Sequence, residues 1–235
     1  MPIGLFTDVG ALGIGGLLGG LIGKHLSAPM KEAMNHTFGF CAIFISVTLM
    51  MKMHALAPVV LAVVLGTIIG ELLRLEDRVQ SLFSGNWIRI FCGGVPLEAA
   101  QQNTFQAVAV LFCCSGTGWY GVLTEGFTGD SSILLTKAIL DFFTAVIFAA
   151  ALGRVVSLLA TPQLLIFVLL FGVSRLVIPL ISAEMLADFS AVGGIVELTT
   201  GMRIAGIKRD TKVLNLTPAM LLVFPISALW TYFSL

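Results

Sequence analysis

Eight stretches of this chain, each of roughly 20 mostly apolar residues, restrict its fold more than any other feature. A helix of that length crosses the hydrocarbon core of a bilayer, which is about 30 Å thick. The composition agrees, because 57 % of the residues are hydrophobic and only 11 % are charged, whereas soluble domains carry about twice that charge. We predict an all-α polytopic membrane protein with about eight transmembrane helices, at residues 3–23, 33–52, 56–73, 104–123, 132–153, 162–181, 188–207 and 214–234.

The connections between these stretches are short, so the whole chain (residues 1–235) is predicted to form a single transmembrane domain. The longest connection covers residues 73–102. Its first part, residues 74–91, places apolar residues on one helical face with arginines interspersed, which is typical of a helix lying on the cytoplasmic surface of a membrane. Residues 93–102 are expected to form a loop.

Basic residues are distributed unevenly between the two sides of the predicted membrane. Ten of the thirteen Lys and Arg residues fall on one side, and the positive-inside rule places that side in the cytoplasm. Both termini are then expected outside the cytoplasm, in the periplasm if the host is a bacterium. The ten residues are Lys24, Lys31, Arg74, Arg78, Arg89, Arg154, Arg203, Lys208, Arg209 and Lys212.

The opposite side is expected to be acidic, since its loops and helix ends carry Asp8, Glu125, Asp130, Glu184 and Asp188. An acidic rim concentrates cations near the mouth of a pathway. We therefore assign Glu125, Asp130 and Asp188 to an outer mouth. The alternative is that these carboxylates cap helix ends.

The first predicted helix contains glycines at intervals of four residues, in the run GIGGLLGGLIG. Gly15, Gly19 and Gly23 form one series, and Gly16 and Gly20 form another. Small residues at this spacing let helix backbones approach closely in lipid. They predict a packing surface, and a homo-oligomer joined through this helix is one use for it.

Two parts of the chain share a sparse pattern, in which Ser-Ala-x-Met opens the second predicted helix at Ser27 and the seventh at Ser182. If spans 1–3 and 6–8 are repeats, the two spans between them make the repeats enter the membrane from opposite sides. Inverted repeats are the ground plan of many secondary transporters. The alternative is chance matching between apolar helices. The further matches are Gly39 with Gly194 and Pro58 with Pro218.

Two acidic residues, Asp141 and Glu197, lie near the middle of predicted spans. Ionisable groups inside a membrane are expensive and usually functional. Lys137 lies one helical turn before Asp141, so the two side chains can pair on one face. The alternatives are that Lys137 and Asp141 form a purely structural pair, and that Glu197 is protonated and hydrogen-bonded between helices.

The fourth predicted helix contains a polar, flexible interruption, Ser115-Gly116-Thr117-Gly118. Glycines there should loosen the helix near its middle, and carbonyls freed at that depth must be buried in protein or line a hydrated cavity. Unwound carbonyls and carboxylates suit a cation better than an anion. In the alternative, the glycines are only packing contacts. The predicted substrate-binding residues are Ser115, Gly116, Thr117, Lys137, Asp141, Glu197 and Thr200.

A turn is expected after this helix. Gly126 and Gly129 should let the loop from Glu125 to Asp130 fold back into the fifth helix. Asp130 or Ser131 would then cap that helix.

No pattern for catalysis is present, since the chain lacks a P-loop, an HExxH motif and a recognisable Ser-His-Asp set. The four cysteines, Cys41, Cys92, Cys113 and Cys114, do not have metal-ligand spacing. We therefore predict a protein that is not an enzyme, with no cofactor, no metal site and no nucleic-acid partner.

Three segments carry a resemblance to a known family, namely LFCCSGTGWYGVLTEGFTGDSSILLTKAILDFFTAVIFAAALG, ADFSAVGGIVELTTGMRIAGIK and LGTIIGELLRLED. They resemble the YqgA-type family of bacterial membrane proteins, a domain of unknown function, and the resemblance extends over essentially the whole chain. It implies the inner membrane of a bacterium, without an assigned substrate. The motif positions are Ser115, Gly116, Gly118, Glu125, Gly126, Gly129, Asp130, Lys137, Asp141, Asp188, Gly193 and Gly194.

The chain departs from this family at two acids. The resemblance implies asparagine at the position of Asp8 and an apolar residue at the position of Glu197. Asp141 is therefore expected to be the more general charge of the site.

Together these features predict a secondary transporter or facilitator of a small cationic or proton-coupled solute, with the lipid bilayer and that solute as partners. Asp141 would be the principal charge and Lys137 its exchangeable partner, because such a pair in low dielectric can separate when a proton or cation arrives. The alternatives are an oligomeric ion channel and a non-transporting membrane scaffold or sensor that binds through residues 74–91.

Overall fold

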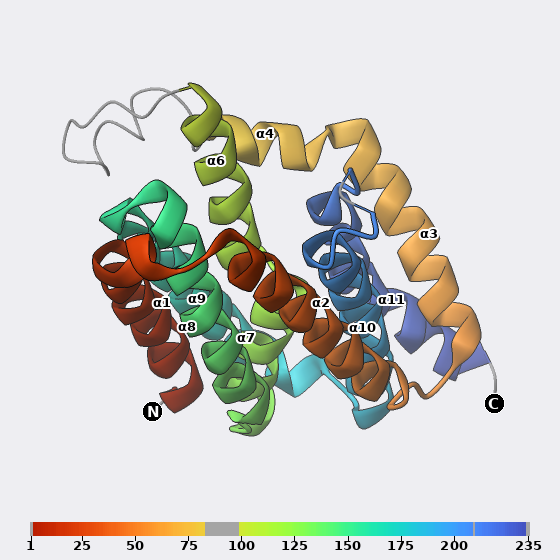
Figure 1. Cartoon of the computed structure of the whole chain (residues 1–235). Coiled ribbons are helices and arrows are strands. Elements are labelled where there is room, and N and C mark those ends of the chain that lie inside the picture. The colour runs from red at the N-terminus through yellow and green to blue at the C-terminus, as the bar shows by residue number, and fades with distance from the viewer. Residues whose placement is uncertain (1, 83–98, 209, 234–235) are drawn as a thin grey trace.

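The computed structural model describes residues 2–82, 99–208 and 210–233, and the regular secondary structure within these ranges is helical (Figure 1). The α-helices are α1 (Ile3–Ile22), α2 (Ala28–Met50), α3 (Leu56–Leu73), α4 (Leu75–Leu82), α6 (Ala99–Cys113), α7 (Gly116–Thr128), α8 (Ser132–Leu152), α9 (Ala160–Val177), α10 (Ala183–Ile204) and α11 (Pro218–Phe233). Four short 3₁₀ segments join them, η1 (Gly23–His25), η2 (Arg154–Leu159), η3 (Ile178–Leu180) and η4 (Val213–Leu216).

In the described part of the chain, seven helical segments are long and apolar enough to cross a membrane. An all-α chain with membrane-spanning helices is therefore confirmed, whereas the predicted number of eight crossings is not established by this criterion. The predicted span that is missing from these seven segments is 188–207, most of which is covered by α10. It carries two buried acids, Asp188 and Glu197. The seven segments are Ile3–Ile22, Ala28–Met50, Leu56–Leu73, Thr104–Thr128, Ser132–Leu152, Arg154–Leu180 and Val213–Phe233.

The helices form two groups that meet at α7. On one side α1 packs along α8 and beside α9, while on the other side α2 packs along α10 and α3 along α11 (Figure 1). The apolar core is divided in the same way. One cluster is built around Phe189, Val192 and Met220, and another around Phe105 and Phe112. Helix α7 contacts α9 of the first group and α10 of the second, so its residues lie where the two groups join.

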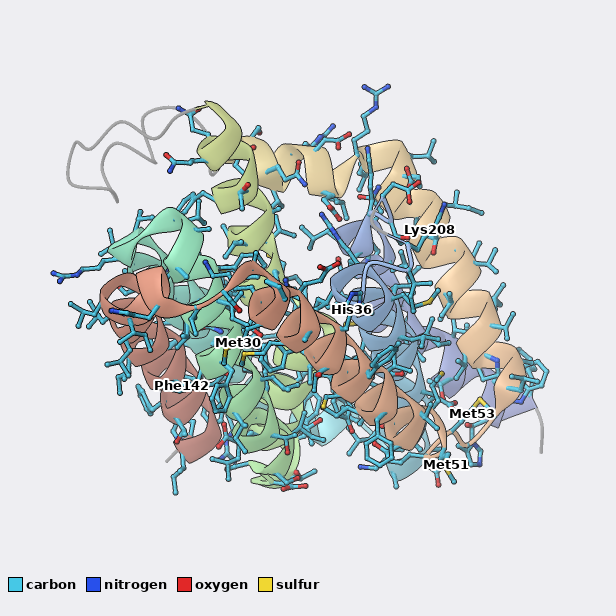
Figure 2. The ribbon with its side chains drawn as sticks, viewed as in Figure 1. Met30, His36, Met51, Met53, Phe142 and Lys208 are labelled. Carbon is cyan, nitrogen blue, oxygen red and sulfur yellow. The ribbon has the colours of Figure 1, made fainter. Side chains whose placement is uncertain are left out.

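The two ends of the bundle differ in character. Both chain termini lie at one end, and α4 lies at the other (Figure 1). Side chains at the α4 end include Lys208, whereas Met51 and Met53 lie near the opposite end (Figure 2). We call the end at α4 the basic end and the end with both chain termini the terminal end.

The glycine series of α1 packs against the same chain. A Cβ atom added at Gly16 would lie 2.5 Å from the backbone N of Ser157, and one added at Gly20 would lie 2.5 Å from Cγ of Arg154. The predicted packing surface is confirmed, but α8 and η2 occupy it. This glycine face is therefore filled by the chain itself, and a homo-oligomer remains a prediction. The remaining glycines lie against α8, namely Gly15 at Phe142, Gly19 at Val146 and Gly23 at Ala150.

Helices α2 and α10 begin alike and pack through matching positions. Oγ of Ser27 accepts a hydrogen bond from the N–H of Met30 at 3.4 Å, and Oγ of Ser182 accepts one from Met185 at 3.3 Å. Each serine thus caps its helix in the usual N-cap manner.

The contacts between α2 and α10 are also reciprocal. Gly39 of α2 lies against Ala205, where an added Cβ would be 2.5 Å from the backbone N, and Gly194 lies against Met50, 2.8 Å from Cγ. Ala205 follows Gly194 by the same number of residues as Met50 follows Gly39. The two helices are therefore antiparallel.

The turn after α7 differs from the expected loop. Helix α7 continues to Thr128, so Glu125 and Gly126 are helical. Gly126 is needed for packing, since a Cβ there would overlap the hydroxyl of Ser174 on α9. The reversal occurs at Gly129, whose φ of 79° suits glycine. Oδ1 of Asp130 then accepts a hydrogen bond from the N–H of Ser132, the first residue of α8, at 2.9 Å, whereas Ser131 at the N-cap position makes no side-chain capping bond.

The connection at 73–102 is described only in part. Helix α4 is the beginning of the predicted interfacial helix, and residues 83–98 lie outside the described ranges. The expected loop is wrong for residues 99–102, because α6 already begins at Ala99.

Candidate functional site

The predicted interruption of the fourth helix is confirmed, since α6 ends at Cys113 and α7 begins at Gly116. Ser115 has an extended backbone, and its Oγ accepts a hydrogen bond from the N–H of Gly118 at 3.1 Å. Serine competes for backbone groups in this way and so favours an N-cap over a helix interior. The chain therefore starts a new helix in the middle of the bundle.

The backbone groups freed by the break find buried partners. The N–H of Thr117 donates to Oε2 of Glu197 on α10 at 3.0 Å. On the other side of the break, the carbonyl of Phe112 accepts from Nε2 of Gln163 at 3.3 Å, and that of Cys113 accepts from the indole of Trp119 at 3.1 Å. Burial without such partners would be costly.

The glycines at the break also permit close packing. A Cβ at Gly116 would lie 2.7 Å from Cγ1 of Val196 on α10, and one at Gly118 would lie 3.0 Å from Cε of Lys137 on α8. The packing interpretation of these glycines is thus correct alongside the helix break. It brings the break next to the charged residues of α8 and α10.

The predicted pair of Lys137 and Asp141 belongs to a larger buried network. Nζ of Lys137 donates to Oδ2 of Asp141 and, at 3.0 Å, to Oδ2 of Asp8 on α1. Nε2 of Gln163 on α9 donates to the same two oxygens, at 3.0 Å for Asp8 and 3.3 Å for Asp141. The ammonium also lies 5.6 Å from the ring centroid of Phe167, a cation–π contact.

Asp8 and Gln163 are the members of this network that the sequence analysis missed. Asp8 was expected at the acidic rim, but its exposed fraction is 0 %. Its position inside an otherwise apolar predicted span was the available signal. Gln163 stands at the start of an apolar run, where a single amide gives no comparable indication.

The network has more negative than positive groups. Asp8 and Asp141 together face one ammonium, that of Lys137. Glu197 adds a third buried carboxylate, and the groups of Thr117 that bind it, the backbone amide and the side chain, are neutral. Buried charges that are not balanced by a partner are strongly unfavourable. Three carboxylates against one ammonium leave an excess of two negative charges, so two protons or additional monovalent cations would restore the balance.

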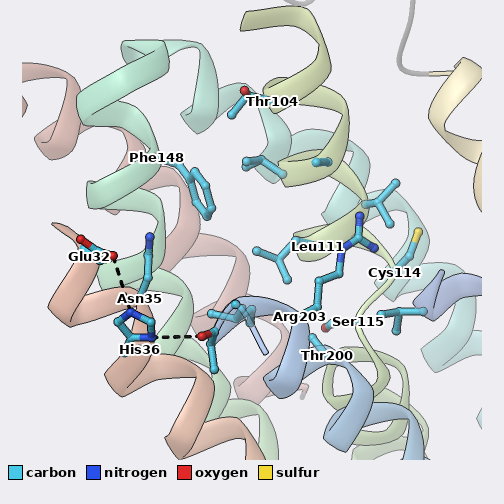
Figure 3. Close-up of a pocket in the computed structure, with 17 residues that line it drawn as sticks. Glu32, Asn35, His36, Thr104, Leu111, Cys114, Ser115, Phe148, Thr200 and Arg203 are labelled. Atoms are coloured by element: carbon cyan, nitrogen blue, oxygen red, sulfur yellow. Dashed lines mark hydrogen bonds and ion pairs between the residues drawn. The ribbon is translucent and has the colours of Figure 1, made fainter. Parts of the chain in front are cut away.

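A cavity of about 450 Å³ leads toward these residues from the basic end. Its rim includes Glu32 of α2 and Thr104 of α6, and deeper in the cavity lie Ser115 and Thr200 (Figure 3). Arg203 of α10 lines the wall. The cavity is therefore enclosed by α2, α6, α8 and α10.

A second, smaller chamber of about 30 Å³ adjoins this cavity. The two spaces share four lining residues, Leu111, Ser115, Thr200 and Ile204. The chamber brings together six of the seven predicted substrate-binding residues. They are Ser115, Thr117, Lys137, Asp141, Glu197 and Thr200, and Gly116 is adjacent to them in the chain.

Toward the terminal end the space is filled by aromatic rings. Phe189 of α10 stacks on Phe224 of α11 with a centroid distance of 4.9 Å, and it also contacts Tyr120 of α7 at 5.3 Å. Phe127 closes the group from the end of α7, with its centroid 6.4 Å from that of Phe189. We call these four residues the aromatic cluster.

Two of the three residues assigned to an outer mouth, Glu125 and Asp188, are buried and bind the starts of helices. Glu125 is buried and accepts from the N–H groups of Gly4 and Leu5 at the start of α1. Asp188 is buried and accepts from the N–H groups of His54 and Ala55 before α3. Both carboxylates stabilise helix N-termini, which was the stated alternative.

Asp130 is the third of these acids and is exposed. The hydrogen bonds from Ser132 lower its pKa below the ordinary value. This is the expected effect of donors on a carboxylate at a helix start.

At the basic end, an ion pair fixes α4 to the second group of helices. Nη1 of Arg203 lies 2.6 Å from Oε1 of Glu76, and the N–H of Leu214 donates to Oε2 of the same carboxylate at 3.1 Å. The N–H of Glu76 donates to Asn215 at 2.9 Å. Arg203 therefore faces the large cavity with its charge already paired.

Comparison with known proteins supports the resemblance seen in the sequence. The family described as "Protein of unknown function (DUF554)" matches residues 3–228. The chain is 43 % identical over 233 residues to "Uncharacterized protein YqgA" of Escherichia coli (strain K12), with 98 % of each chain covered. It is 23 % identical over 220 residues to "Uncharacterized membrane protein YdfK" of Bacillus subtilis (strain 168), with 88 % of each covered. No solved structure matches the chain.

Proposed function

Since the chain belongs to the DUF554 family of proteins of unknown function, we propose its activity from its own site: it is a secondary transporter or facilitator of a small cationic or proton-coupled solute. Asp141 is the principal charge, and Lys137 is its exchangeable partner. Ser115 and Thr117 supply hydroxyls at the helix break. The protein catalyses no reaction in this proposal.

The observation that carries this proposal is the pair of adjoining cavities. The larger one begins at the basic end, and the smaller one ends at Lys137, Asp141 and Glu197. Ligand sites of transporters typically lie near the midplane, beside a discontinuous helix. The break between α6 and α7 at this depth agrees with that arrangement.

The aromatic cluster favours a carrier over a channel. It fills the space between α7, α10 and α11 on the terminal side of the chamber. A solute that reaches Asp141 from the basic end would need a movement of these helices to leave at the other end. This corresponds to one state of an alternating-access cycle.

The membrane orientation follows from the same arrangement. We propose the bacterial inner membrane, with the basic end in the cytoplasm and both termini in the periplasm. The position of both termini at one end (Figure 1) supports an even number of crossings, eight when α10 is counted. The reciprocal contacts of Gly39 and Gly194 support an inverted repeat.

The test is flux into proteoliposomes that contain the full chain and an entrapped pH-sensitive dye. Inward gradients of Na⁺, K⁺ and methylammonium are applied in turn, with the membrane potential clamped. We expect at least one gradient to change the internal pH, and Asp141→Asn to abolish the change. Asp210→Asn, an exposed acid beside Lys208, is the matched control and should retain it.

Two results would overturn the proposal. One is unchanged flux through a well-folded Asp141→Asn protein, with folding judged by its elution volume and melting temperature. The other is unitary conductance steps in planar bilayers, which would establish a channel.

A further inference from the structure

Two carboxylates line the small chamber, and the hydrogen bonds described above each engage one of their two oxygens. The hydrogen bonds that Asp141 receives from Lys137 and Gln163 both go to Oδ2, so neither of these groups binds Oδ1. The backbone N–H of Thr117 donates to Oε2 of Glu197 and not to Oε1. Asp141 and Glu197, which lie on different helices, thus line one space, and the side chain of Thr117 also approaches Glu197 there.

Thr144 gives an independent indication of a ligand. Threonines inside helices commonly donate to a carbonyl of their own helix, and Thr136 and Thr200 do so at 2.9 and 3.0 Å. Thr144 is 5 % exposed and lines the chamber. Among the described residues, its hydroxyl has no hydrogen-bond partner. Because Thr144 lines the chamber and its Oγ1 is not among the fully enclosed atoms, the hydroxyl is available to a particle that occupies this space.

The size of the chamber limits what can bind. Its volume of about 30 Å³ holds one or two particles the size of a water molecule. An organic solute would have to remain in the larger cavity. A single ion without most of its hydration shell fits the chamber.

The chemistry of the lining selects the class of ion. Besides five apolar residues, the described lining contains carboxylates, hydroxyls and one ammonium, without a histidine or cysteine. Oxygen ligands favour hard cations over transition metals. Among the described residues, no group of three or more His, Cys, Asp or Glu could hold a metal ion, and Mg²⁺ in addition sheds its water reluctantly. A monovalent cation therefore fits best.

We propose that the chamber is a binding site for a dehydrated alkali cation of the Na⁺ class, held by Asp141 Oδ1, Glu197 Oε1 and the Thr144 hydroxyl. The inference rests on the proposed transport function and names its substrate or coupling ion. The ammonium of Lys137 occupies the other side of Asp141, shared with Asp8. It acts as a tethered cation that competes for the same carboxylate.

The experiment is equilibrium binding of ²²Na⁺ to the purified full chain in detergent, with choline chloride holding the ionic strength constant. We expect saturable binding of about one Na⁺ per chain, with Li⁺ competing and Mg²⁺ not competing. Thr144→Val should raise the dissociation constant about tenfold, the size of one lost hydrogen bond to a charged group. Thr144→Ser, which keeps the hydroxyl, should largely preserve affinity.

Matched variants control for nonspecific effects. Thr136→Val changes a threonine of the same helix that is exposed and bonded to its own backbone, and it should leave the dissociation constant unchanged. Glu197→Gln should weaken binding at least tenfold, whereas Glu184→Gln on the same helix should not. Melting temperatures exclude unfolding as the cause.

The outcomes separate this inference from the transport proposal. Absence of saturable Na⁺ binding, or binding that Thr144→Val and Glu197→Gln leave unchanged, would overturn the cation site. Flux of methylammonium without Na⁺ binding would also overturn it while supporting transport. Na⁺ binding with the expected variant pattern, but without flux in proteoliposomes, would support the site and overturn the transport function.

Discussion

The backbone N–H of Thr117 donates to Oε2 of Glu197 at 3.0 Å, so a carboxylate of α10 occupies the N-terminus of α7 at the helix break. Helix N-termini favour negative charge through their free N–H groups and their dipole. This contact joins the interrupted helix to α10. It makes the geometry of the break dependent on one acidic side chain.

Glu197 should therefore contribute to stability as well as to binding. Glu197→Ala removes the acceptor and leaves the N–H of Thr117 buried without a partner, which costs about 1–3 kcal/mol. Glu197→Gln keeps an acceptor oxygen and should lower the melting temperature less. Thermal unfolding in detergent measures both. Equal losses in the two variants would show that the hydrogen bond is unimportant.

Asp8 competes with Asp141 for the ammonium of Lys137. Asp8→Asn removes that competition, so the ammonium should bind Asp141 more tightly and resist displacement by a cation. We expect the dissociation constant for Na⁺ to rise about threefold or more, the effect of less than one ordinary hydrogen bond. Binding of ²²Na⁺ measures this change. A lower dissociation constant would contradict the tethered-cation role of Lys137.

The glycines of α1 are predicted to differ according to what they face. Gly16→Ala would place a methyl group 2.5 Å from the backbone of Ser157 and should destabilise the protein by about 1–3 kcal/mol. Gly10 has no atom within 4 Å of an added Cβ, so Gly10→Ala is the matched control. Melting temperatures of the two variants, measured side by side, test the close contact between α1 and η2.

The ion pair at the basic end should be sensitive to the loss of one partner. Arg203→Met leaves the buried carboxylate of Glu76 without its cation and should cost about 2–4 kcal/mol, somewhat below the full buried-pair range because Arg203 is partly exposed. Lys212→Met removes the exposed pair with Asp77 and should cost less than about 1 kcal/mol. A comparable fall in melting temperature for both variants would contradict this difference.

Asp130 provides a prediction about pH. Its pKa is lowered by the donors of Ser132, so the ionised form is favoured in the folded state. The stabilisation is present above the ordinary aspartate pKa and is lost as the pH falls through the lower, folded-state pKa. The melting temperature of Asp130→Asn should thus lie below that of the unchanged protein at pH 7, and the two should converge toward pH 3.

Sequence reasoning succeeded where the signal is local. Ser115 and the two glycines after it interrupt an apolar run, and the interruption appears as the break between α6 and α7. The i to i+4 spacing of Lys137 and Asp141 is fixed by helix geometry, so their pairing followed once the helix was recognised. Glu125 and Asp188 were expected at an outer mouth but are buried. Whether a carboxylate faces water or caps a neighbouring helix depends on which helix is nearby.

The sequence by itself determined the membrane-spanning α-helical class, since runs of apolar residues can only be buried in lipid or in other helices and their backbone must be satisfied internally. It also determined the family and the position of the helix break. Only the tertiary structure decided that Asp8 and Gln163 join Lys137 and Asp141, that Glu197 reaches the start of α7, and that the glycines of α1 meet α8 and η2. These contacts join residues up to 155 positions apart in the chain. Apolar helices offer lipid and one another nearly equivalent surfaces, so the choice of neighbours comes from shape and buried polar contacts.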